Sequence, residues 1–385
     1  CSFVNRFGEI PEGKLAESIH TSPNWIDGEF RNQQPTSVMI GKDGFVEAWW
    51  KFLTNSTPDL KPAAPLPCTH TDLSALDPSR DIAVWLGHSG LYFQLAGLRF
   101  LVDPVYSAYA SPVSFINKSF EFRGGYPFTA KTTPPIDLLI LTHDHWDHLD
   151  CETIKALDHK VKRYAVPLGV NSHLLAWGIN PDKILVFDWY DAARFTEPKP
   201  EVVHPFHKPE KRLQPAEWKS GALQAPAIYF FPSRHFSGRT LKRDQTLWGS
   251  YVIEAGGKRL YLSGDGGNGP HFKEIGDLFR NSGGFDLAFI EDGQYNADWA
   301  EIHMAPEGSV KAATEVGAKS VIPIHNCRYA LTRHAWYDPL ERIRMASHLA
   351  DWKLLTPKVG DVVPIGDLTI EFPAWWRDVP KSASS

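Results

Sequence analysis

The stretch Leu139-Ile-Leu-Thr-His-Asp-His-Trp-Asp-His148 restricts what this chain can be more than any other part of the sequence. An apolar run from Ile136 to Leu141 ends abruptly in polar residues, which is typical of a buried strand. Imidazole suits Zn²⁺, and carboxylate oxygens complete its usual ligand set. Such a cluster of ionisable groups would be costly to desolvate without a partner. The stretch therefore predicts a metal site directly after a strand, with these potential ligands: His143, His145, Asp147 and His148.

The length and composition of the chain allow an ordinary globular protein. Its 385 residues can bury a sizeable core in one large domain or in two ordinary ones. A net charge of -5 provides no basic excess that could neutralise phosphates, so we predict no nucleic-acid partner. No apolar run approaches the length of a membrane span.

Side chains of the metal-binding type also follow other predicted strands. The strand 227–231 leads to His235, the strand 259–263 leads to Asp265, and the strand 320–324 leads to His325. The glycines around Asp265 would let the backbone approach an ion closely. Ligand-type residues at four strand ends are hard to explain as core packing. The alternation of strands and helices along the chain predicts an α/β layered fold.

The pattern H-x-H-x-D-H resembles the signature of the metallo-β-lactamase superfamily. From about Asp81 to about Ile370, the chain is similar to its N-acylphosphatidylethanolamine phospholipase D branch and the bacterial relatives of that branch. The resemblance implies an αββα sandwich, in which helices flank two mixed sheets. We expect an N-terminal arm over residues 1–70, a catalytic domain over 71–373 and a tail over 374–385. Within the arm, Asp27-Gly-Glu-Phe-Arg-Asn32 resembles a motif of the bacterial relatives.

The resemblance also implies a site for two ions. His143, His145 and His235 would hold the first ion, and Asp147, His148 and His325 would hold the second. Asp265 would bridge both ions. Two Zn²⁺ fit this histidine-rich set best, although Fe or Mn could occupy the half that contains carboxylates. The residues predicted to be catalytic are Asp147, Asp265 and His303, of which His303 could act as a general acid or steady a developing oxyanion.

By the same resemblance, the reaction would be phospholipase D-type hydrolysis of an N-acylated phospholipid by a hydroxide that bridges the two ions. Two residues are predicted to contact the substrate. Arg239 could pair with the phosphate, and His88 could touch the site or be an ordinary turn histidine. One alternative is a lactonase or β-lactamase-like hydrolase that uses the same metal site. Another is a non-catalytic envelope protein that keeps the fold as a binding scaffold.

The sequence also carries expectations about location and partners. Cys1 followed by Ser2 resembles the start of a processed bacterial lipoprotein, which would anchor the protein in the cell envelope; the alternative is a cytoplasmic protein. The expected partners are a small-molecule or phospholipid substrate and, peripherally, a membrane surface, and the oligomeric state is unknown. Trp375-Trp376 could lie at such a surface or cover the core.

Four further local expectations come from patterns along the chain. Apolar residues at helical spacing predict helices near Val46–Leu53 and over Pro339–Trp352. The segment Leu354–Ile365 resembles the closing hairpin of the superfamily. His204 and His207 lie in a Pro-, Lys- and Glu-rich segment, so we expect them to be surface histidines in a loop.

Overall fold

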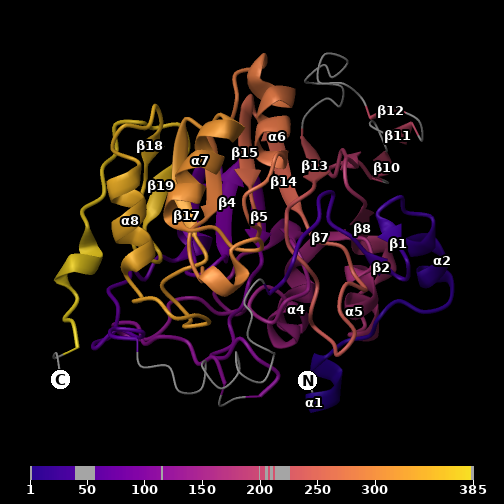
Figure 1. Cartoon of the computed structure of the whole chain (residues 1–385), viewed down its shortest axis with the longest axis horizontal. Coiled ribbons are helices and arrows are strands. Elements are labelled where there is room, and N and C mark those ends of the chain that lie inside the picture. Colours follow the sequence, from indigo (N-terminus) through magenta and orange to yellow (C-terminus); the bar gives the residue numbers. More distant parts are fainter. Residues whose placement is uncertain are drawn as a thin grey trace.

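The computed structural model describes residues 2–39, 57–113, 116–198, 200–203, 207–208, 211–212 and 226–382. Figure 1 shows the whole chain, with helices around its two sheets. Three subjects of the sequence analysis lie outside the described residues: Cys1, the predicted helix Val46–Leu53 and His204.

The first sheet has seven strands in the order β19-β3-β4-β5-β6-β7-β8. Strands β3 to β5 form an antiparallel meander, and the order then continues in parallel from β5 to β8. Its strands are β3 (Ile82–Trp85), β4 (Leu91–Leu95), β5 (Leu98–Val102), β6 (Ile136–Ile140), β7 (Val161–Pro167), β8 (Ile184–Phe187) and β19 (Val362–Pro364).

The second sheet has eight strands in the order β10-β9-β13-β14-β15-β16-β17-β18. It is antiparallel from β10 to β15 and parallel from β15 to β18. Its strands are β9 (Ala192–Ala193), β10 (Val202–Val203), β13 (Ala227–Phe231), β14 (Ser250–Ala255), β15 (Lys258–Leu262), β16 (Leu287–Glu291), β17 (Ser320–Ile324) and β18 (Lys353–Leu354).

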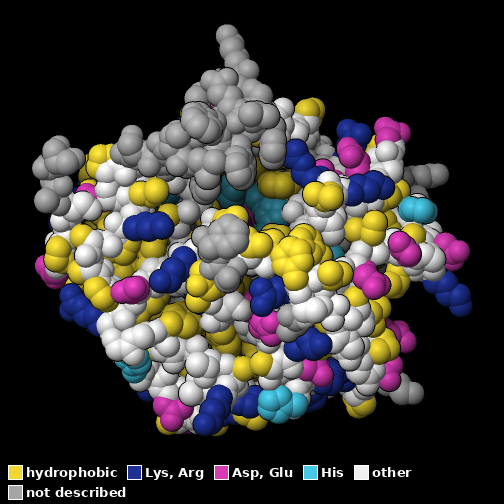
Figure 2. Space-filling view, turned by 90° about the horizontal axis from the view of Figure 1, so that it is seen from below, with side chains coloured by type: hydrophobic (Ala, Val, Ile, Leu, Met, Phe, Trp, Pro, Cys, Tyr) yellow, Lys and Arg dark blue, Asp and Glu magenta, His cyan; other side chains and the backbone are white. Residues whose placement is uncertain are grey.

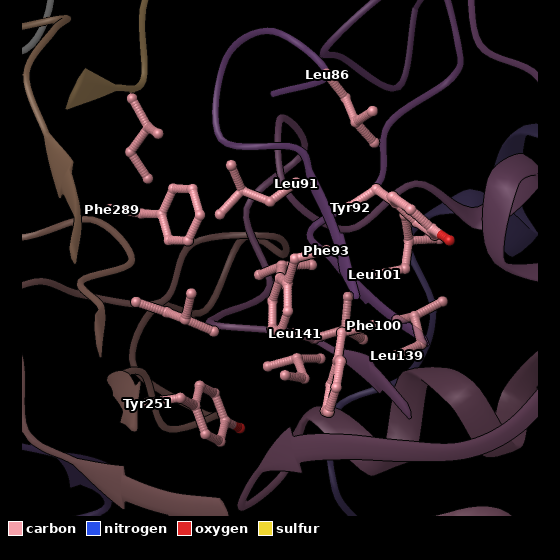
Figure 3. Close-up of a cluster of buried hydrophobic side chains, with 14 of the residues drawn as sticks. Leu86, Leu91, Tyr92, Phe93, Phe100, Leu101, Leu139, Leu141, Tyr251 and Phe289 are labelled. Carbon is pink, nitrogen blue, oxygen red and sulfur yellow. The ribbon is translucent and has the colours of Figure 1, made fainter. Parts of the chain in front are cut away.

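The two sheets pack face to face through aromatic and aliphatic side chains. Phe93 on β4 stacks on Phe100 of its own sheet, with 4.5 Å between ring centroids, and lies 6.4 Å from Phe289 on β16 of the other sheet. Figure 3 shows these rings together with Leu141 and Tyr251. Strands β4 and β13 to β14 are buried along their whole length, as expected for strands covered on both faces.

Helices cover the outer face of each sheet, so the predicted αββα sandwich is confirmed. The helices α6 (His271–Arg280) and α7 (Pro306–Val316) bury Phe272, Phe279 and Val316 in a second cluster against the outer face of the eight-stranded sheet. The other main helices are α4 (Cys151–Leu157), α5 (Val170–Ala176) and α8 (Asp338–Ala346).

Shorter elements complete the described chain. The N-terminal segment contains α1 (Phe3–Arg6), α2 (Lys14–His20), β1 (Trp25–Ile26) and β2 (Glu29–Phe30), and a small separate hairpin contains β11 (His207–Lys208) and β12 (Lys211–Arg212). His207 therefore begins a short strand and does not lie in the predicted loop. Single 3₁₀ turns occur at Leu73–Ala75, Asp158–Lys160, Pro181–Lys183, Ala297–Trp299 and Trp375–Asp378.

The prediction of a closing hairpin over Leu354–Ile365 is wrong. Strand β18 pairs in parallel with β17, whereas β19 pairs antiparallel with β3, so the chain crosses from one sheet to the other between them. The predicted helix Pro339–Trp352 is also too long. Helix α8 ends at Ala346, and Leu349, which belonged to the predicted apolar stripe, is 81% exposed.

The tryptophan pair near the end of the chain covers the core. Trp375 and Trp376 are both buried, and the indole nitrogen of Trp375 donates to the carbonyl of Thr356 over 3.1 Å. Their burial leaves no ring surface for a bilayer. Among the described residues, the helices are all too short or too polar to cross a membrane. The division of the chain at residues 70 and 373 stays a prediction.

Candidate metal centre

The candidate centre lies where strand ends from both sheets meet. Strand β6 of the seven-stranded sheet leads into the 143–148 segment, and the strands β13, β15 and β17 of the other sheet lead to His235, Asp265 and His325. After β6 the chain turns sharply, because the carbonyl of His145 accepts the amides of both His148 and Leu149 over 3.1 and 2.8 Å. This turn brings the last two residues of the motif back towards the strand ends.

Three histidines form the first cluster. The ring centroids of His143 and His145 are 4.4 Å apart, and each lies 4.9 Å from that of His235. One ring nitrogen of each lies within 4.8 Å of the others, which is close enough to share an ion. The three residues predicted to hold the first ion therefore converge.

The second cluster contains the other three predicted ligands. Asp147, His148 and His325 place one ligand atom each within the same 4.8 Å, and His88 joins them. The Nε2 of His148 lies 3.5 Å from Oδ2 of Asp147. The Nε2 of His88 donates to that same oxygen over 2.7 Å. His88 thus orients a predicted ligand.

Asp265 lies between the two clusters. Its Oδ2 is 3.9 and 4.0 Å from the Nε2 atoms of His143 and His235, and 3.1 Å from that of His148. Its Oδ1 is 3.2 Å from Nδ1 of His325. The carboxylate thus faces both clusters, which is the position that a bridging ligand requires.

Hydrogen bonds outside the clusters fix the direction of three imidazole rings. His148 donates from Nδ1 to Asp103 over 2.8 Å, and His235 donates from Nδ1 to the carbonyl of Ile302 over 3.1 Å. The hydroxyl of Thr142 donates to Asp103, so it accepts from Nδ1 of His143. In each ring Nδ1 carries a proton, so Nε2 is the nitrogen that offers a lone pair when the ring is neutral.

Several buried polar atoms at the centre of the site find no hydrogen-bond partner among the described residues. They are the Nε2 atoms of His143 and His148, and Oδ1 of Asp265. Buried polar groups are normally hydrogen-bonded, so a group of such atoms that converge needs another partner. Imidazole nitrogens and a carboxylate oxygen with free lone pairs fit divalent cations.

The ionisation of the clustered groups agrees with this fit. Burial and then the neighbouring histidines hold the pKa of His143 well below its usual value, and burial lowers that of His145 to about 4. These rings are neutral near pH 7, as ligands must be. His148 is the exception: burial alone would lower its pKa, but Asp265, Asp147 and Asp103 raise it well above the ordinary value, so this ring must lose a proton before it can bind an ion. Burial raises the pKa of Asp265 to about 7, as expected for a carboxylate buried without a cation.

Four residues at or near the centre have an unusual backbone conformation. His88, Asp103 and His325 have φ angles of 54°, 41° and 68°, and Cys327 has 58°. These angles lie in the left-handed region of backbone conformation, which residues other than glycine seldom adopt. Such conformations persist only where the surroundings hold them, and they are commonly found at functional sites.

His303 lies at the edge of the centre. Its ring centroid is 5.2 Å from that of His235 and 5.3 Å from that of His325. Its Nδ1 is hydrogen-bonded to Oε1 of Glu291, and the second oxygen of Glu291 accepts the amide of Gly266 over 2.9 Å. Glu291 is completely buried. One side chain therefore supports both His303 and the loop that carries Asp265.

A comparison with protein families matches residues 98–326 to the family described as "Beta-lactamase superfamily domain". The chain belongs to the β-lactamase superfamily. An uncharacterised protein of Mycobacterium tuberculosis is 32% identical over 92% of this chain and 88% of its own length. The N-acyl-phosphatidylethanolamine-hydrolyzing phospholipase D 1 of Caenorhabditis elegans is 27% identical over 74% of this chain and 76% of its own length.

A solved structure agrees with the β-lactamase superfamily fold. Igni18, described as a novel metallo hydrolase from the archaeon Ignicoccus hospitalis, superposes with a TM-score of 0.50 at 17% sequence identity. The match covers 73% of this chain and 97% of that structure. At this identity the likeness concerns the fold alone.

For one residue of this β-lactamase superfamily chain, the structure favours a role other than the predicted one. Arg239 was expected to pair with a substrate phosphate, but it is 2% exposed. Its guanidinium donates to the carbonyls of Arg6, Asp144 and Leu149 and lies 4.1 Å from the ring centroid of Trp146. Although Arg239 lines a cavity of about 200 Å³, most of its five N–H groups already have acceptors. Its contacts hold the turn that carries the ligands.

His88 is the other residue predicted to contact the substrate. It is 2% exposed, and its Nε2 is already bonded to Asp147. The structure therefore favours the role of an orienting neighbour over that of a substrate contact.

The sequence analysis missed three residues that support the centre: Asp103, Glu291 and Asn32. Asp103 follows strand β5 and Glu291 ends strand β16, much as the predicted ligands follow their strands. Their positions in the sequence could therefore have indicated that they lie near the centre. Asn32 lies in the motif of the arm, but its contact with His235 joins residues 203 positions apart. Local sequence contains no sign of that contact.

Proposed function

We propose that this protein is a hydrolase that uses two divalent metal ions, and that its substrate is a phosphodiester of the N-acylated phospholipid class. The observation that carries the proposal is the convergence of seven potential ligands in two buried clusters, with the carboxylate of Asp265 between them. His143, His145 and His235 would hold one ion, and Asp147, His148 and His325 would hold the other. Asp265 would contact both.

A pair of bound divalent ions supplies hydroxide at neutral pH and polarises the bond to be cleaved. The protein itself contributes orientation. Asp103 and the carbonyl of Ile302 fix the tautomers of His148 and His235, and His88 holds one oxygen of Asp147. Removal of such supporting contacts typically weakens metal binding by about 10- to 100-fold.

The phosphodiester substrate is supported by the relative from Caenorhabditis elegans, whose name gives this activity, over three quarters of the chain. Figure 2 shows a hollow in the face that carries the strand-end loops, with histidine side chains at its floor and hydrophobic side chains along part of the rim that the described residues form. An apolar surface beside a polar floor suits a lipid whose phosphate must reach the ions while its acyl chains stay outside.

His303 is proposed as the group that donates a hydrogen bond to the leaving oxygen and steadies the negative charge that develops there. Burial raises the pKa of Glu291 well above its usual value, so this carboxyl keeps its proton. It then donates from Oε1 to Nδ1 of His303, while its other oxygen accepts the amide of Gly266. Neutral His303 consequently carries its own proton on Nε2, the nitrogen available to a substrate.

This arrangement predicts how variants of Glu291 behave. Glu291→Gln should keep turnover within a few-fold of the wild type, because the amide can donate to His303 and accept from Gly266 as the neutral carboxyl does. Glu291→Leu should lower turnover roughly 10- to 100-fold, because His303 then loses its orienting partner. Steady-state kinetics alongside metal analysis would measure both. Equal losses in the two variants would mean that a charged carboxylate is needed instead.

The substrate class is tested by parallel assays of the metal-loaded protein on an N-acylated phosphatidylethanolamine, an acyl-homoserine lactone and a β-lactam. The expected products of the first are a phosphatidic acid and an N-acylethanolamine. In water enriched in oxygen-18, the label should enter the phosphatidic acid, because the water oxygen bonds to phosphorus and the bond from phosphorus to the ethanolamine oxygen breaks. A His145→Ala variant, prepared identically, controls for contaminating enzymes. Hydrolysis of only the lactone or the β-lactam would replace the proposed substrate and keep the metal centre.

A further inference from the structure

The segment that follows strand β2 lies against the segment that carries His235. The side-chain amide of Asn32 donates from Nδ2 to the carbonyl of His235 over 2.7 Å, and its Oδ1 accepts the amide of His235 over 3.1 Å. The same oxygen accepts the indole N–H of Trp248 over 3.2 Å. One side chain thus satisfies both backbone groups of a single histidine.

His235 needs such a partner because it lies beyond the end of its strand. The ladder between β13 and β14 ends at the pair Phe231 and Ser250, so it provides no hydrogen bonds four residues later. Buried backbone groups without partners are costly. Asn32 takes the place of the missing strand. With Nδ1 of the ring bonded to the carbonyl of Ile302, His235 is held at both its backbone and its ring.

Neighbouring contacts anchor the same part of the arm. The guanidinium of Arg234 donates to the hydroxyl of Thr36 and to the carbonyl of Pro35, each over 3.0 Å. The amide of Phe30 donates to the carbonyl of Asp244 over 2.8 Å. These bonds lie on both sides of Asn32, so the amide is fixed in place before any ion arrives.

We propose that Asn32 is a positioning residue of the metal centre, and that the N-terminal segment is a structural part of that centre. The inference rests on the proposed function, in which His235 binds an ion together with His143 and His145. An asparagine is required because its side chain must donate to the carbonyl of His235 and accept from the amide of the same residue. Aspartate has the same shape but presents an oxygen to the carbonyl of His235, and alanine provides neither group.

The test compares Asn32→Asp and Asn32→Ala with Gln33→Ala, a control at the adjacent exposed position. Competition with a chelator would measure the affinities of each metal-free protein for the first and for the second Zn²⁺ ion. Both Asn32 variants should weaken one of these affinities by about 10- to 100-fold and leave the other within threefold. The control should match the wild type. The proposal would be overturned if both Zn²⁺ affinities were unchanged. It would also be overturned if both affinities fell equally and thermal stability fell strongly.

A second measurement does not depend on metal binding. Hydrogen exchange at the backbone amide of His235 in the metal-free protein should be faster in Asn32→Ala than in the wild type, and unchanged in Gln33→Ala. If the wild type bound no Zn²⁺, the proposed function would fail while this measurement still tested the contact. Equal exchange rates in all three proteins would show that Asn32 does not hold His235.

Discussion

Replacing Asp265 with alanine should reduce the metal content from about two ions per chain to less than one, and turnover should fall at least about 100-fold. The reason is its position, since its two oxygens lie 3.1 to 4.0 Å from nitrogens of histidines in both clusters. Metal content would be measured by elemental analysis, and folding by circular dichroism.

A matched control for this variant is Asp277→Ala. Asp277 lies on α6, where it pairs with Lys273 and Arg280 at the surface. Surface pairs of this kind contribute little to stability. The control should therefore keep its full metal content and activity. An Asp265→Ala protein that retained two ions and normal turnover would exclude Asp265 as a bridging ligand.

The same residue predicts a pH dependence in the metal-free protein. Burial raises the pKa of Asp265 to about 7, whereas the unfolded chain has the ordinary value near 4. The folded state therefore binds this proton more tightly, and the contribution of Asp265 to stability decreases as the pH rises from about 4 to about 7. Metal-free Asp265→Asn, which cannot ionise, should gain stability relative to the wild type between pH 5 and pH 8. Urea unfolding of both proteins at pH 5 and at pH 8 would measure this difference in the free energy of unfolding.

Replacing Arg239 with alanine should destabilise the protein by about 3 to 5 kcal/mol, with or without bound metal. The guanidinium bonds the carbonyls of Asp144 and Leu149 over 3.1 and 2.7 Å, and also that of Arg6. It lies against the rings of Trp146 and Trp177, at 4.1 and 5.1 Å from their centroids. Its removal leaves buried acceptors without donors and a void between the rings.

Arg243→Ala is the control, because Arg243 is exposed four positions further along the same loop, 5.7 Å from the ring centroid of Phe236. It should change the free energy of unfolding by less than about 0.5 kcal/mol. Urea unfolding of the three proteins would measure the difference. If Arg239→Ala unfolded like the wild type and raised only KM for a phosphodiester, the original prediction of a substrate contact would be restored.

Sequence patterns alone predicted an α/β layered fold and the strand ends after which the candidate ligands lie. The strands 227–231 and 320–324 were predicted with the bounds that the structure has, because each is a short buried run with polar residues or turns at its ends. The residues that follow strand ends are local features. They showed in the sequence where His235, Asp265 and His325 would lie relative to the sheets, and the resemblance to a known family joined them into one set.

The contacts that those residues make depend on the tertiary structure. Leu354–Ile365 was recognised as extended, but the choice between one hairpin and two sheet edges depends on neighbours far along the chain. Arg239 was recognised as a charge near the site, and its burial turned it into a support for the ligand turn. Asn32 illustrates the limit most clearly. Secondary structure follows from neighbouring residues, whereas a hydrogen bond across 203 positions exists only after the core has brought its two ends together.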